Sequence, residues 1–167
     1  MTNITGSMAV SKKRRRLLAI GLFILYFTVL FYFLFFSEEL GRTYSERTYH
    51  YNLVPFKEIG RFIRYHKRLG TGTVLLNIVG NVAAFVPFGI FLPVFSTRCR
   101  KFWFTAYYSF ELSLLVELLQ LVAKVGSFDV DDLLLNTLGG IIGFFVYWLG
   151  KRILWGNKGE KTPEERL

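Results

Sequence analysis

Three aspartates, Asp129, Asp131 and Asp132, stand directly before a long apolar segment, in the stretch GSFDVDDLLLNTLGG at residues 126–140. Carboxylates at the start of a helix cap free backbone N–H groups and interact favourably with the helix dipole. One carboxylate suffices for that, and three neighbouring like charges repel one another. The cluster therefore indicates either a helix cap with surplus charge or part of a binding or catalytic site.

Further polar residues interrupt the apolar segments at helical spacing. The pairs are Asn77 with Asn81, Glu117 with Gln120, and Asp132 with Asn136. The members of each pair lie three or four residues apart, so each pair shares one helix face. Because polar side chains are costly against lipid, we expect these faces to point at one another or at a hydrated cavity.

These faces predict one polar pocket. Its expected lining is Asn77, Asn81, Glu117, Gln120, Asp129, Asp132 and Asn136. Within it, Glu117, Asp132 and Asn136 are predicted to form a hydrogen-bonded cluster, with Asp129 and Asp131 at its solvent-exposed rim. The alternative is purely structural, with the amides joining helices through hydrogen bonds that contribute about 0.6 kcal/mol each.

Four long apolar segments must carry these residues. They cover 17–36, 73–95, 102–123 and 131–150. A bilayer core of ~30 Å needs about 20 helical residues to cross it. The predicted fold class is therefore all-α, an integral membrane four-helix bundle. The membrane domain covers 17–150, with a basic tail at 1–16 before it and a second tail at 151–167 after it. Gly139 and Gly143 have the spacing that permits close helix approach.

The formal net charge of +9 sits mostly at the ends of the apolar segments, which argues against nucleic-acid binding. The basic run at 12–16 precedes the first segment, so the positive-inside rule places both termini in the cytoplasm. A cleaved signal peptide is the alternative, but its apolar region would be shorter. This topology places the polar pocket in the outer half of the membrane. The basic 37–72 segment then lies outside, which is an exception to the positive-inside rule.

An amphipathic interfacial helix is predicted at about 55–69. In PFKEIGRFIRYHKRLG, one face is apolar and the basic residues lie largely off it, which is typical of a helix lying in the membrane interface. This helix either anchors the chain among anionic headgroups or recognises a lipid phosphate or pyrophosphate. The residues expected to contact phosphate are Arg61, Arg64, Lys67 and Arg68.

The chain resembles the VanZ-like family of bacterial membrane proteins. The matching pieces are NLVPF at 52–56, NIVGNVAAFVPFGIFLP at 77–93, SLLVELLQL at 113–121 and GSFDVDDLLLNTLGGIIGF at 126–144. Many members have an arginine just before the Phe-Asp step, where this chain has Gly126 and Ser127, so no role of that arginine carries over. The resemblance implies a multi-pass protein of the bacterial cytoplasmic membrane. It also implies a link to resistance against teicoplanin and related lipoglycopeptides, without supplying a mechanism.

The favoured hypothesis is binding of an amphiphile at the outer leaflet. The ligand would be a lipoglycopeptide or a polyprenyl-linked wall precursor, with no cofactor and no metal. Asp129, Asp132 and Glu117 would meet cations, the basic helix would meet phosphate, and aromatic walls would hold an acyl or prenyl chain. The expected wall residues are Phe85, Phe88 and Phe128.

Two other classes stay open. In an intramembrane enzyme, Glu117 and Asp132 would be an acid/base pair, since burial raises a carboxylate's pKa toward neutrality. A divalent ion held by Asp129, Asp132 and Glu117 is a variant of that hypothesis. A non-catalytic role in a membrane complex or oligomer is suggested by Glu111, which lies near the midplane off the Glu117 face.

Overall fold

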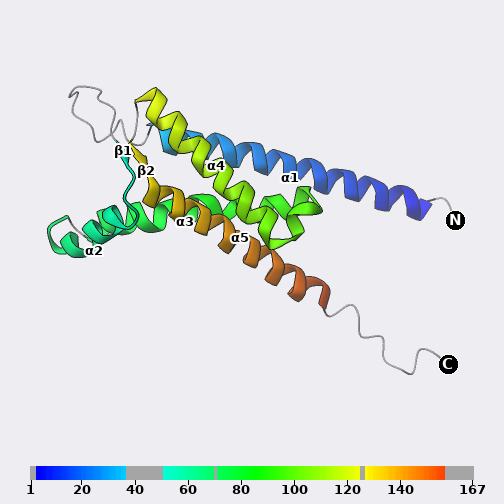
Figure 1. Ribbon diagram of the computed structural model, residues 1–167. Coiled ribbons are helices and arrows are strands. Elements are labelled where there is room, and N and C mark those ends of the chain that lie inside the picture. The colour runs from blue at the N-terminus through cyan, green and yellow to red at the C-terminus, as the bar shows by residue number, and fades with distance from the viewer. Residues whose placement is uncertain (1–2, 37–50, 70, 125–126, 157–167) are drawn as a thin grey trace. The chain divides into compact units, whose positions relative to one another are not determined.

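The computed structural model describes residues 3–36, 51–69, 71–124 and 127–156 (Figure 1). In these residues the α-helices are α1 (Asn3–Phe36), α2 (Lys57–Leu69), α3 (Thr71–Phe95), α4 (Phe102–Ala123) and α5 (Val130–Gly156). A 3-10 turn, η1 (Arg98–Arg100), joins α3 to α4. The strands β1 (Tyr51–Asn52) and β2 (Phe128–Asp129) pair with each other. The chain is therefore helical as predicted, apart from a strand pair that the sequence analysis did not anticipate.

Three helices are long and apolar enough to cross a membrane. Their apolar stretches are Asn77–Phe95, Phe102–Ala123 and Val130–Leu154. These confirm, by length and composition, three of the four predicted spans. In α1 the apolar stretch found among the described residues is the shorter Arg16–Tyr32, although the helix extends back to Asn3. Membrane crossing by α1 and the four-helix arrangement stay predictions.

The chain forms two compact units, which are described separately. One comprises residues 1–51 and 116–128, and therefore holds α1 and the last two turns of α4. The other comprises residues 52–115 and 129–167, and holds α2, α3, η1, the first part of α4, and α5. Asn52, Asn81, Asp129, Asp131 and Asp132 all lie in this second unit.

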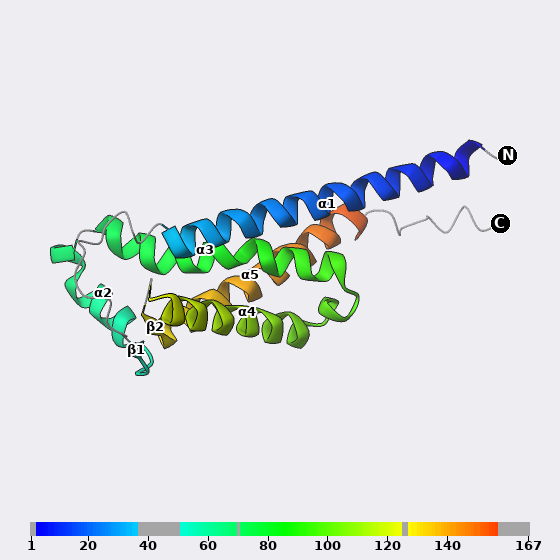
Figure 2. The same cartoon turned by 90° about the horizontal axis from the view of Figure 1, so that it is seen from above.

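Helices α3 and α5 pack along each other in the second unit (Figure 2). Glycines permit the approach: a Cβ on Gly139 or on Gly143 would lie 2.1 Å from a backbone oxygen of α3. This confirms the close approach predicted from their spacing. Gly89 and Gly140 extend the contact, since a Cβ on Gly89 would lie 1.9 Å from the Gly140 oxygen.

The first part of α4 packs against α5 in this unit. Its Phe102 ring meets Phe144 of α5 edge to face, with centroids 6.0 Å apart. The Thr105 hydroxyl donates a 2.7 Å hydrogen bond to the Cys99 carbonyl and so fastens η1 to α4. The connection between α3 and α4 is thereby fixed by a buried polar contact.

Candidate polar site and interfacial helix

Asp131, in the first turn of α5, caps a different helix. Its carboxylate accepts backbone N–H hydrogen bonds from Glu58 at 2.8 Å, from Ile59 at 3.1 Å and from Phe56 at 2.5 Å. These are the unpaired donors at the start of α2, which an acidic side chain satisfies well. Phe56 has a φ of 63°, a costly conformation for a bulky residue. The bond from its N–H to Asp131 helps to hold it.

Asp129 fastens the residues that precede α2. Its Oδ1 accepts a 3.1 Å bond from the Asn52 amide and a 2.8 Å bond from the Asp131 backbone N–H. Burial raises the pKa of the Asp129 carboxyl, while these two hydrogen bonds act in the opposite direction. The Asn52 Oδ1 in turn accepts from the Val54 N–H at 3.3 Å. Asp129 and Asp131 therefore attach residues 52–59 to the start of α5.

The predicted rim position of Asp129 and Asp131 is wrong. Their exposed fractions are 6% and 1%. The prediction assumed that the start of α5 faces water, whereas residues 52–59 cover it. Both of these aspartates have hydrogen-bond partners, which helps to explain how a carboxylate cluster is stable at this helix start.

Asp132 is the third aspartate and is half-buried. Its Oδ1 accepts a 2.5 Å hydrogen bond from the Asn81 amide of α3. Asn77 is exposed one turn before Asn81. Asn136, one turn after Asp132, is 1% exposed, and its Oδ1 has no hydrogen-bond partner. The structure therefore brings Asn81 and Asp132 together, as the shared-pocket hypothesis expects of them.

Glu117 and Gln120 are buried, with exposed fractions of 2% and 8%. They lie in residues 116–128, which belong to the other compact unit. The predicted cluster of Glu117 with Asp132 and Asn136 stays a prediction. Glu111 is exposed on α4, where its carboxylate interacts with the Tyr107 hydroxyl one turn earlier.

The amphipathic helix α2, predicted to lie in the membrane interface, lies beside β1 at the end of α3 and α5 where those helices begin (Figure 1). Phe56 and Ile63 expose 67% and 62% of their surface. Arg61 pairs with Glu58 at 2.6 Å and remains more than half exposed, and Arg64 is exposed. The side chains of Lys67 and Arg68 lie outside the described residues. We call residues 53–65 the interfacial platform.

Phe85 and Phe88 do not form a wall for a ligand chain, contrary to expectation. They expose 0% and 7% of their surface and are part of the core. Phe128 is half-buried in β2. The sequence showed that these residues are aromatic, but which face of α3 turns inward depends on its packing against α5.

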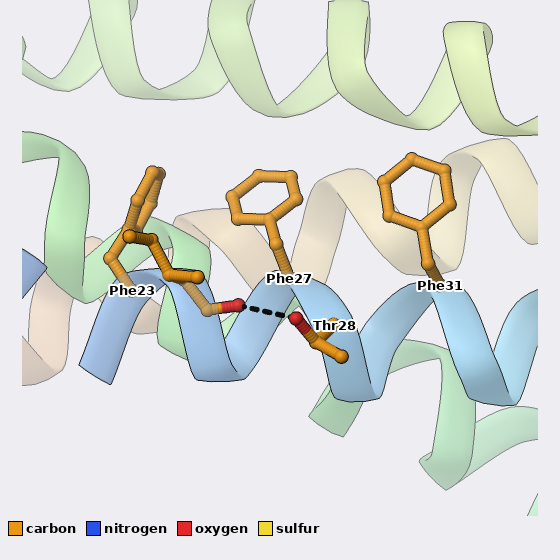
Figure 3. Close-up of a pocket in the computed structure, with 5 residues that line it drawn as sticks. Phe23, Phe27, Thr28 and Phe31 are labelled. Atoms are coloured by element: carbon orange, nitrogen blue, oxygen red, sulfur yellow. Dashed lines mark hydrogen bonds between the residues drawn. The ribbon is translucent and has the colours of Figure 1, made fainter. Parts of the chain in front are cut away.

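A shallow apolar groove runs along α1 (Figure 3). The rings of Phe23, Phe27 and Phe31 stand in a row beside it, and the first two centroids are 4.8 Å apart. The Thr28 hydroxyl is bound to the Ile24 carbonyl of its own helix at 3.0 Å. This groove therefore offers apolar contact rather than a polar site.

The residues that the structure describes hold no group of three or more His, Cys, Asp or Glu side chains placed to bind a metal. Asn52 was not predicted as a partner of Asp129, although NLVPF was among the matching pieces. Thr105 and Ser109, which are fully buried on α4, were not predicted as polar core residues either. Their spacing of four residues, continuing from Ser113, was the available signal.

Comparison with known proteins agrees with the resemblance inferred from the motifs. Residues 23–153 match the family model VanZ/LLP1. The chain is 29% identical over 142 residues to Protein VanZ of Enterococcus faecium, an alignment that covers 82% of this chain and 78% of that protein. No solved structure gives a significant match. The family model spans most of the chain, from within α1 to the last turns of α5, so this protein belongs to the VanZ/LLP1 family.

Proposed function

We propose that this protein binds a phosphate-bearing amphiphile, of the polyprenyl-linked wall-precursor class, at the outer leaflet of the membrane. The observation that carries this proposal is the attachment of the interfacial platform to α5 through Asp131. A helix that only anchors the chain needs an apolar face and positive charge. A helix that presents a binding surface must also be held in a fixed orientation, which the Asp131 cap supplies.

The charge of the platform favours a phosphate ligand over a cationic one. Asp129 and Asp131 are buried and occupied by hydrogen bonds from Asn52 and from the start of α2. Lys57 and Arg64 are exposed on the platform. Phosphate binds well to basic side chains. The exposed apolar residues of the platform would meet the lipid chain.

The polar residues beneath the platform would bind the remaining headgroup. Asp132 and Asn81 present a half-buried carboxylate–amide pair, and Asn77 is exposed nearby on α3. Such groups accept and donate hydrogen bonds to hydroxyl and amide groups of a sugar or peptide. Binding of this kind would connect the family's link to lipoglycopeptide resistance with wall precursors in the outer leaflet.

A binding measurement on the purified protein in nanodiscs tests the proposal. The variant Lys57→Gln/Arg64→Gln should bind a polyprenyl pyrophosphate lipid at least about tenfold more weakly, since each charge near an anionic surface contributes ~1 kcal/mol. The matched control is Lys151→Gln/Arg152→Gln, which removes the same charge from exposed residues near the other end of α5. Equal losses in the two variants would contradict the proposal.

The same experiment separates ligand recognition from anchoring. Both variants are also titrated with phosphatidylglycerol, an anionic lipid with a single phosphodiester. Recognition predicts that Lys57→Gln/Arg64→Gln loses far more affinity for the pyrophosphate lipid than for phosphatidylglycerol. Parallel losses for the two lipids would show that α2 is an anchor only.

A further inference from the structure

A line of buried polar side chains runs along α4. Thr105, Ser109 and Ser113 follow one another at intervals of four residues, and each is 0% exposed. Glu117, 2% exposed, continues the same spacing. At 1.5 Å per residue these four residues span about 18 Å of the helix. That is more than half of the ~30 Å hydrocarbon thickness that a membrane span must cross.

The hydroxyls of Ser109 and Ser113 lie against α5. The Ser113 hydroxyl donates a 3.4 Å hydrogen bond to the Leu133 carbonyl. Two turns along, a Cβ built on Gly140 would lie 2.0 Å from the Ser109 Oγ, so this hydroxyl rests directly on the α5 backbone. We call this contact region between α4 and α5 the polar seam.

Two polar atoms on these two helices are buried without a partner. They are the Ser109 Oγ and the Asn136 Oδ1. Asn136 is one turn before Gly140 on α5, about 6 Å along the helix. Unpaired polar groups are costly inside a membrane protein, and buried water is the usual partner of such groups. The two orphaned atoms therefore indicate that water enters the seam.

We propose that the polar seam conducts protons through the membrane, with water bridging Asn136 and Ser109. At the α2 end the titratable group is Asp132, half-buried one turn before Asn136. At the other end, Thr105 is bonded to the Cys99 carbonyl in the turn between Arg98 and Arg100. Polar and ionisable residues inside membrane spans mark ion pathways and proton relays.

The chemistry of the seam suits a proton rather than a larger species. The Ser109 Oγ lies directly against Gly140, and the three buried side chains that precede Glu117 on this line are hydroxyls. A hydroxyl both donates and accepts, so it passes a proton by accepting one from a neighbouring water and releasing its own to the next. No bond to carbon forms or breaks in this transfer. Once the proton has passed, the hydroxyl group rotates back to its starting orientation and is chemically unchanged.

Proteoliposomes with an enclosed pH-sensitive dye test this inference. A potassium gradient with valinomycin drives protons inward, and the initial rate of acidification is recorded. Vesicles with the wild-type protein should acidify faster than protein-free vesicles. Ser109→Ala should lower the protein-dependent rate at least about tenfold, which corresponds to a barrier higher by about 1.4 kcal/mol. Asn136→Leu, which removes the second proposed water partner, should have a similar effect.

The matched control is Thr28→Ala. It also removes a hydroxyl from a helix, but Thr28 is exposed on α1 and bonded to its own backbone, so the rate should equal that of wild type. Size-exclusion elution and helical circular dichroism verify that each variant is folded. Wild-type vesicles no faster than protein-free ones, or an unchanged rate in folded Ser109→Ala or in folded Asn136→Leu, would overturn the inference. Because the interfacial platform is untouched, this result is independent of lipid binding.

Discussion

Asp131 binds the backbone of a segment that lies 72 to 75 residues away in the sequence. Its single carboxylate satisfies donors that α2 cannot pair internally. Asp129 and Asn52 hold the preceding residues, so the orientation of α2 depends on a small number of buried polar contacts. At the scale of single residues, these contacts connect the interfacial platform to the membrane-spanning helices.

We expect Asp131→Ala to release the start of α2. Loss of this charged acceptor leaves three partly buried N–H donors without it, at a cost of about 1–3 kcal/mol. Hydrogen exchange in detergent should accelerate at the amides of Phe56, Glu58 and Ile59. Asp132→Ala is the control, because Asp132 is bonded to Asn81 instead. Equal acceleration in both variants would show that the cap is not specific to Asp131.

Asp129 should make the stability depend on pH. Its pKa is raised in the folded state, chiefly by burial. Folding therefore favours the protonated carboxyl, and this contribution is present below the unfolded pKa of about 3.9. It is lost as the pH rises through the folded pKa. Asp129→Asn stays neutral and keeps the Oδ1 acceptor, so its thermal midpoint relative to wild type should rise between pH 4 and pH 8. A difference that does not change with pH would contradict this assignment.

At the scale of elements, the glycines of α5 determine how closely α3 approaches. A side chain at Gly139 would collide with the α3 backbone at 2.1 Å. A backbone oxygen cannot rotate away, so the helices would have to separate. Both helices are apolar, and in a membrane such helices associate by close packing rather than by the hydrophobic effect. The packing of α3 on α5 therefore depends on these small residues.

The variant Gly139→Ala should lower the thermal midpoint in detergent, with a cost of at least about 1–3 kcal/mol from overpacking. Gly80→Ala is the matched control on α3, because nothing lies within 4 Å of a Cβ built at Gly80. That control should be neutral or stabilising by about 0.5–1 kcal/mol, since alanine favours a helix. Similar destabilisation by both changes would show that helix propensity, rather than the close contact, sets the result.

At the scale of the whole molecule, three helices able to cross a membrane and membership of the VanZ/LLP1 family indicate a membrane protein. The proposed site also depends on orientation, because the platform must face the outer leaflet to meet a wall precursor there. The basic residues at 12–16, at the start of the apolar stretch of α1, and those in the connection between α3 and α4 predict that these two segments lie in the cytoplasm. The basic 37–72 segment is the exception to this charge pattern.

Reporter fusions test that orientation. Fusions after Arg16, Arg100 and Lys158 should report a cytoplasmic location, and a fusion near Glu46 should report an external one. An alkaline phosphatase and a fluorescent protein reporter at each position provide complementary signals. A cytoplasmic signal near Glu46 would move the platform to the inner leaflet and would exclude binding of an externally exposed precursor.

The sequence by itself determined the helical class, three helices long and apolar enough to cross a membrane, the amphipathic helix α2 and the glycine contact, because each depends on a local pattern. Hydropathy over about 20 residues selects a span, and spacings of three or four residues define a helix face. Only the tertiary structure decided what each aspartate does. Asp129, Asp131 and Asp132 have the same side chain within four positions, and they differ in the donors that reach them. Those donors come from residues 52–59 and from α3, which are distant in the chain. No local pattern therefore distinguishes Asp131, which caps α2, from Asp132, which accepts a hydrogen bond from Asn81.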